Sequence, residues 1–118
     1  MNNSIITNNK VNGYGGGICN SGAMSITNST ISNNIAGNGG GGISSSGEIT
    51  IEDSIITNNT VTNGYGGGLS TCILHLYGSI ISNNKAQEAG GLFNRFKAYV
   101  DDQTIVINNT PTNLGATP

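Results

Sequence analysis

The chain has 118 residues, of which 19 are glycine and only 8% are charged, with a formal net charge of −2. This length suits one domain, and the charge balance excludes the basic footprint of a nucleic-acid-binding protein and the polybasic patch that binds anionic membranes. No apolar run approaches the roughly 20 residues that span a bilayer, so we expect no membrane insertion by this segment.

A hexapeptide of the form Ser-Ile-Ile-Thr-Asn-Asn begins at residue 4 and returns every 25 residues, near positions 29, 54, 79 and 104. A fixed period of this size is typical of stacked repeats, in which no unit buries its apolar face alone. We therefore expect a single domain over residues 1–118, with one coil starting near each of these positions. We allow that the chain is a fragment of a longer solenoid.

Each repeat holds three short apolar segments separated by Asn and Gly corners, as at 4–9, 15–18 and 24–26 in the first row. None has a helical period, and strands spaced this regularly pair with their counterparts in the next row, which makes parallel sheets. Crossovers between parallel strands are right-handed. The sequence predicts an all-β, right-handed parallel β-helix of about four and a half coils with three short strands each.

Alternation along these strands assigns side chains to the core or to the surface. Three columns are expected to point inward: Ile6, Ile31, Ile56, Ile81 and Val106; Met24, Ile49, Leu74 and Tyr99; and Ile26, Ile51 and Leu76. The same alternation predicts that the first Ile of the hexapeptide points to the solvent, at Ile5, Ile55, Ile80 and Ile105. Thr30 occupies this position in the second row. We predict that this exposed stripe contacts a partner.

The asparagines and glycines of the corners have a mechanical role. Glycine supplies positive φ and close backbone approach, and Asn tolerates the left-handed region while its amide can bond to the next coil. We expect an asparagine ladder through the second Asn of each pair, at Asn9, Asn34, Asn59, Asn84 and Asn109. The tight turn favours the second Asn, although spacing alone leaves the choice between the two open.

Two motifs that return once per coil resemble a known family. Gly-Gly-Gly-Ile at 40–43 with Ile-x-x-Asn at 56–59, and Gly-Gly-Gly-Leu at 66–69 with Ile-x-x-Asn at 81–84, are similar to the Gly-Gly-Ala-Ile/Leu and Phe-x-x-Asn repeats of chlamydial-type polymorphic outer membrane proteins. The chain differs in having Ile for Phe, and Gly17, Gly42 and Gly68 for the Ala of the family. The resemblance implies a surface β-helix from an exported adhesin-like protein, located at the cell surface or outside the cell, although the chain as given has no signal peptide.

Residues with chemical potential are few. His75 is the only histidine; it is expected on an outward strand face with Tyr77 beside it and Glu52 diagonally below, which makes a weak candidate for an acid/base pair. A solvated histidine is the favoured interpretation. Cys19 and Cys72 lie about two repeats apart, beyond disulfide reach, and we expect two free thiols. We expect no catalytic residue, no metal site and no cofactor.

The predicted function is that of a non-catalytic, adhesin-like β-helix module that acts as a rigid scaffold or binding surface for a host or cell-surface glycan or protein. The alternative is a carbohydrate-binding or polysaccharide-active β-helix of the pectate-lyase kind. A second alternative is a self-assembling filament unit that associates end to end, because neither end shows a recognisable cap and both would present unpaired strand edges.

Overall fold

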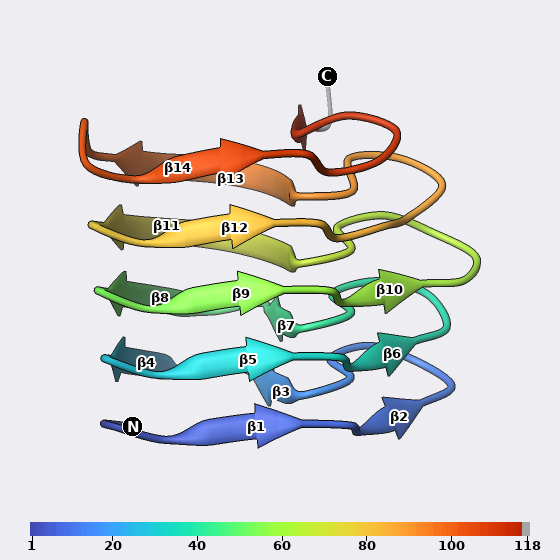
Figure 1. The fold of residues 1–118 in the computed structure, drawn as a ribbon, viewed down its shortest axis with the longest axis horizontal. Helices are drawn as coiled ribbons and strands as arrows, with labels where there is room; N and C mark the ends of the chain where they lie inside the picture. Colours follow the sequence, from blue (N-terminus) through green and yellow to red (C-terminus); the bar gives the residue numbers. More distant parts are fainter. Residues whose placement is uncertain (117–118) are drawn as a thin grey trace.

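The computed structural model describes residues 1–116, which form a parallel β-solenoid of about four turns. In Figure 1 the chain runs from left to right along the front strands, returns behind them, and climbs from the N-terminus at the bottom to the C-terminus at the top. This path is a right-handed coil, as predicted. The described residues contain no helix, and therefore no helix long and apolar enough to cross a membrane.

Three parallel sheets run along the solenoid. The hexapeptides form the first, whose strand order is β1 (Ile5–Thr7), β5 (Thr30–Ser32), β9 (Ile55–Thr57), β12 (Ile80–Ser82) and β14 (Ile105–Ile107). The second and smallest consists of β2 (Lys10–Val11), β6 (Ile35–Ala36) and β10 (Thr60–Val61). The third contains β3 (Ile18–Asn20), β4 (Ala23–Thr27), β7 (Ile43–Ser45), β8 (Glu48–Glu52), β11 (Leu69–Tyr77), β13 (Leu92–Val100) and β15 (Leu114–Ala116).

The strands divide along each coil differently from the expectation. The glycine-led and alternating segments belong to one sheet, and in the upper coils they fuse into the continuous strands β11 and β13, each of nine residues. The extra sheet comes instead from the residues just after each Asn pair, such as Lys10–Val11. Segments of only two residues in a corner carry too little periodicity to be recognised as strands.

The register holds at 25 residues between successive hexapeptides, so that Ile6 pairs with Ile31 and Ile56 with Ile81. The main core is one cluster built from several stacked columns of aliphatic side chains, and in the hexapeptide column Ile31, Ile56 and Ile81 have no exposed surface. The stack through Ile26, Ile51 and Leu76 is equally buried. These two inward columns are confirmed.

The third inward column is correct for Met24, Ile49 and Leu74 but wrong for Tyr99. An irregularity between Thr71 and Ile73 shifts the register of β11 against β13. Ala98 therefore lies opposite Leu74, and Tyr99 lies opposite His75 with 45% of its surface exposed. The segment from Leu92 to Ala98 is one residue longer than the segment from Leu69 to Leu74 with which it pairs. The spacing of apolar residues in the sequence could not show at which position the extra residue is accommodated.

The glycine runs bring neighbouring coils together. The first Gly of a run has the left-handed conformation, as at Gly40 with φ of 62°. The second permits a close approach: a Cβ on Gly41 would overlap the carbonyl oxygen of Gly67 in the next coil and lie 2.7 Å from that of Thr60. Both roles follow from the missing side chain.

Candidate functional site

The asparagine ladder joins successive coils through buried amides. Asn59 Oδ1 accepts hydrogen bonds from the backbone N and the Nδ2 of Asn34, at 3.0 and 3.1 Å. In the same way Asn84 Oδ1 accepts from the backbone N and the Nδ2 of Asn59, at 2.9 and 3.0 Å. Asn34, Asn59, Asn84 and Asn109 each also donate to a carbonyl of the coil on their N-terminal side, as Asn59 does to Ile31 at 3.1 Å. Each of these four buried amides therefore satisfies backbone or side-chain groups of the neighbouring coils, whereas Asn9 is exposed and donates to the Thr7 carbonyl of its own coil.

The two residues of each Asn pair have different tasks. The second forms the ladder, at Asn9, Asn34, Asn59, Asn84 and Asn109. The first adopts the left-handed conformation, with φ between 55° and 62° at Asn8, Asn33, Asn58, Asn83 and Asn108. Asn is one of the few side chains that tolerate this region, so the pair serves a turn and a ladder at once.

The ladder has a closed end at Asn109. Its backbone N and its Nδ2 both donate to Asn113 Oδ1, each at 3.0 Å. Asn113 thus takes the place of the next rung after only four residues, and the chain then pairs with β13 through Leu114–Ala116. The amide ladder therefore ends on a local turn that supplies the acceptor a further coil would provide, while β14 remains the edge strand of the first sheet.

A second polar ladder was missed in the sequence. The backbone N of Ser29 donates to Ser54 Oγ and that of Ser54 to Ser79 Oγ, both at 3.1 Å, and each hydroxyl donates to the carbonyl two residues before it. These serines have at most 2% of their surface exposed. The signal was present, because the first residue of the hexapeptide is Ser or Thr in every row.

An exposed aliphatic column lies on the outer surface of the first sheet; it runs without a break over Ile55, Ile80 and Ile105, and Thr30 separates it from Ile5. Ile5 is 74% exposed, Ile55 41%, Ile80 37% and Ile105 46%, so the outward orientation expected from alternation is confirmed. Beside it runs a row of hydroxyls in which Ser32 Oγ donates to Thr7 Oγ1 at 3.3 Å, and Thr57 Oγ1 and Ser82 Oγ lie 3.2 Å apart. We call these two columns together the isoleucine face.

The isoleucine face is flat and repetitive because it rests on strands held in exact register by the two ladders beneath it. Its side chains are aliphatic or carry hydroxyls, and none is charged. Contiguous apolar surface on a soluble protein commonly marks a contact site for another molecule. This face can therefore bury apolar surface against a partner without desolvating a charge.

His75 lies on the outer surface of the third sheet, where its neighbours differ from the predicted set. Its Nε2 is 2.9 Å from Glu48 Oε2, and Tyr77 Oη is 3.4 Å from its Nδ1. The ring of Tyr99 stacks on it with centroids 5.0 Å apart. Glu48, not Glu52, is the acidic partner; Glu52 pairs in register with Tyr77, whose side chain occupies that side of His75.

Two groups near this cluster have shifted pKa values. A hydrogen bond and a charge interaction with Tyr99 raise the pKa of Lys97 above its usual 10.5. The pKa of Asp101 is lowered from its usual 3.8, chiefly by the hydrogen bond from Thr104 Oγ1 at 2.7 Å and also by the backbone N of Gly78. Asp101 thus anchors the corner between β13 and β14 as a carboxylate.

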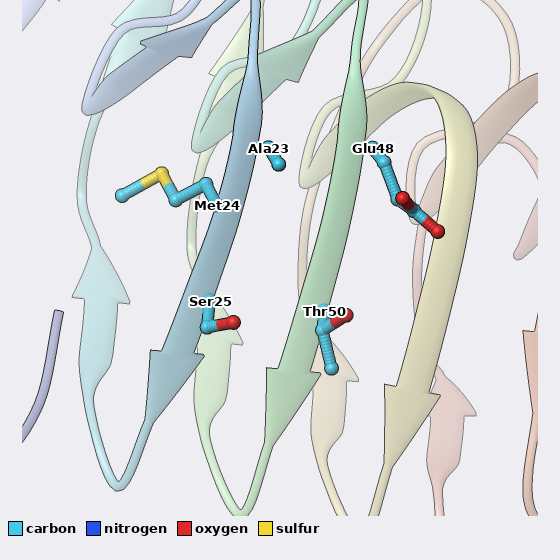
Figure 2. Close-up of a pocket in the computed structure, with 5 residues that line it drawn as sticks. All are labelled: Ala23, Met24, Ser25, Glu48 and Thr50. Carbon is cyan, nitrogen blue, oxygen red and sulfur yellow. The ribbon is translucent and has the colours of Figure 1, made fainter.

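A shallow hollow of about 310 Å³ lies next to Glu48 on β4 and β8. Figure 2 shows the short side chains of Ala23, Ser25 and Thr50 along it, with the Glu48 carboxylate projecting at one side and Met24 leaning away. The hollow and the His75 cluster together offer hydroxyls, a carboxylate and aromatic rings on one surface. Such a combination can hold a polar ring-shaped ligand.

Cys19 and Cys72 are both free thiols, as expected. Within residues 1–116, no group of three His, Cys, Asp or Glu side chains is placed to hold a metal ion. Compared with known proteins, the chain matches no protein-family model, no curated protein and no solved structure.

Proposed function

We propose that this chain is a non-catalytic β-helix module of an adhesin-like surface protein, a rigid scaffold that presents the isoleucine face to a partner. The observation that carries the proposal is the column of exposed isoleucines on a sheet whose backbone is held by buried ladders. Aliphatic side chains in fixed positions lose little conformational entropy when a partner covers them, so their burial is converted efficiently into binding free energy.

The resemblance of the glycine and Asn motifs to outer membrane protein repeats supports a place at the cell surface. A partner for the isoleucine face has a complementary apolar surface, either on a protein or on the hydrocarbon side of a glycan ring. Hydroxyls of Thr57 and Ser82, next to Ile55 and Ile80, would give the contact its polar component.

A panel of polysaccharides and surface proteins tests the proposal. The wild type is compared with the double variant Ile55→Thr and Ile80→Thr, which removes the centre of the face, and with His75→Ala as a control on another surface. We expect binding without turnover that the double variant loses and His75→Ala retains. Binding that survives the double variant would contradict the role given to the isoleucine face.

The alternative, a carbohydrate-active β-helix, is supported by the hydrogen bond between His75 and Glu48, which pairs a proton acceptor with a carboxylate. The same panel distinguishes it. Release of new reducing or unsaturated ends by the wild type, abolished in His75→Ala, would replace the scaffold proposal with a catalytic one.

A further inference from the structure

The isoleucine face repeats with the coil, so it presents similar groups at equal steps along the solenoid. Its strands pair in register at every step, as Ile80 does with Ile55 on one side and with Ile105 on the other. Neighbouring strands of a sheet lie about 4.8 Å apart, and this is the step from one coil to the next. A globular partner has no such translation in its surface, whereas a linear polymer with a similar step can contact every coil in the same way.

A column of exposed asparagines borders the isoleucine face. The first Asn of each pair follows the hydroxyl row directly and is exposed in every coil, at Asn8, Asn33, Asn58, Asn83 and Asn108. Within residues 1–116 none of these five side-chain amides has a hydrogen-bond partner, in contrast to the buried ladder amides beside them. A side-chain amide offers two donors and an acceptor oxygen. Each coil therefore offers polar groups to a ligand that lies over the isoleucine column.

The absence of charge narrows the chemistry of such a ligand. No side chain of the isoleucine face or of the bordering asparagine column is charged. A nucleic acid or an acidic polysaccharide would lose hydration of its charges there without gaining an opposite charge. A neutral chain of sugar rings is complementary instead, because its rings carry C–H groups on their faces and hydroxyls around their edges. The C–H groups would cover the isoleucines, and the hydroxyls would bond to Thr57, Ser82 and the exposed amides.

We propose that the isoleucine face binds a neutral, extended polysaccharide that runs along the solenoid axis, with about one sugar ring over each coil. This inference rests on the proposed function, because it names the partner of the same face. The polysaccharide is extended because each unit of a ribbon advances by about one ring length, a step similar to that between coils. A polysaccharide that coils would turn successive rings away from a flat face. The unbroken column of Ile55, Ile80 and Ile105 is the centre of the site.

The probes are cello-oligosaccharides of two to six units, whose β-linked glucose rings form an extended ribbon. Malto-oligosaccharides of the same lengths are the matched control, since they contain the same glucose units in an α-linked chain that coils. Calorimetric titration measures the affinities, and backbone amide shifts of Thr57 and Ser82 in NMR titrations locate the binding. We expect the affinity to rise at least about tenfold from cellobiose to cellopentaose, and maltopentaose to bind at least about tenfold more weakly than cellopentaose. Equal affinity for the two pentasaccharides, or an affinity independent of length, would overturn the inference.

Two double variants assign the contacts. Ile55→Thr with Ile80→Thr removes the apolar contact, and Asn58→Gly with Asn83→Gly removes two amides while glycine retains the left-handed conformation of the corner. We expect each double variant to weaken cellopentaose binding at least about fivefold, and His75→Ala, on another surface, to leave it unchanged. Thermal midpoints establish that the variants are folded. Full affinity for cellopentaose in either folded double variant would contradict the assigned contacts.

The outcomes separate this inference from the proposed function. If no cello-oligosaccharide binds, but another polysaccharide or a surface protein binds the wild type and not the isoleucine double variant, this inference fails and the proposed function stands. If cello-oligosaccharides bind and their binding survives the isoleucine double variant, both fail.

Discussion

Replacing Asn59 by alanine removes the central amide of the asparagine ladder, where the side chain has no exposed surface. The backbone N of Asn34 loses its acceptor, and a buried donor left without a partner costs about 1–3 kcal/mol. Three further hydrogen bonds disappear, to or from Asn34 Nδ2, Asn84 Oδ1 and the Ile31 carbonyl. Since each contributes about 0.5–1.5 kcal/mol, we expect a loss of about 3–7 kcal/mol in the free energy of unfolding.

The matched control is Asn9→Ala, in the same column at the exposed end of the ladder. Asn9 Nδ2 donates to Asn34 Oδ1 and the Thr7 carbonyl, but Asn34 Oδ1 keeps the hydrogen bond from the backbone N of residue 9. No buried group is orphaned, so the cost is about 1–2 kcal/mol. Urea unfolding followed by circular dichroism measures both. A difference below about 1 kcal/mol between the two variants would refute the reasoning that the buried amides hold the coils together.

Three other perturbations probe the close approach of coils, the two faces of the first sheet and the corner carboxylate. Gly41→Ala should lower the free energy of unfolding by more than about 3 kcal/mol, because the added Cβ would overlap backbone atoms of the next coil. Gly22→Ala should be nearly neutral, because its Cβ would meet nothing within 4 Å. Equal thermal midpoints for the two variants would contradict this. Ile55→Thr, at a half-exposed position, should cost under about 1 kcal/mol and Ile56→Thr, which is fully buried, about 2–4 kcal/mol by urea unfolding; the reverse order would invert the assignment of faces. The lowered pKa of Asp101 means that its stabilising contribution is present above its usual value of 3.8 and is lost as pH falls through the folded value. Asp101→Asn should therefore remove this part of the acid dependence of the thermal midpoint between about pH 6 and pH 2, and an unchanged profile would count against the corner anchor.

Much of the fold could be predicted because one physical rule acts at every repeat. The spacing of Ile6, Ile31, Ile56 and Ile81 requires identical residues to stack, and stacking at a constant period requires parallel sheets. The asparagine ladder follows from the same columns. The serine ladder could have been inferred too, because a small hydroxyl side chain occupies one column in all five rows, but Ser and Thr are ordinary on strand surfaces and their burial was not recognised.

The candidate sites were harder to predict because they depend on contacts that the period does not control. The spacing predicted Glu52 as the diagonal neighbour of His75, but the acidic side chain that contacts His75 in the structure is Glu48. The position of Tyr99 depended on where one extra residue is absorbed in the last corner. A local irregularity of this kind changes which face a side chain points to, since neighbouring residues of a strand alternate.

The hexapeptide by itself determined the coil: its second Ile builds the core, its Asn pair makes the turn and the ladder, and its first Ile lies outside. These features repeat, so each coil confirms the assignment of the next. Only the tertiary structure showed that Tyr14 and Arg95, which are 81 residues apart in the sequence, line the same cleft. The physical reason is that stacked coils bring distant residues together along the axis, while the reach and direction of a single long side chain such as Arg95 depend on the rings of Tyr65 and Phe93 that it meets.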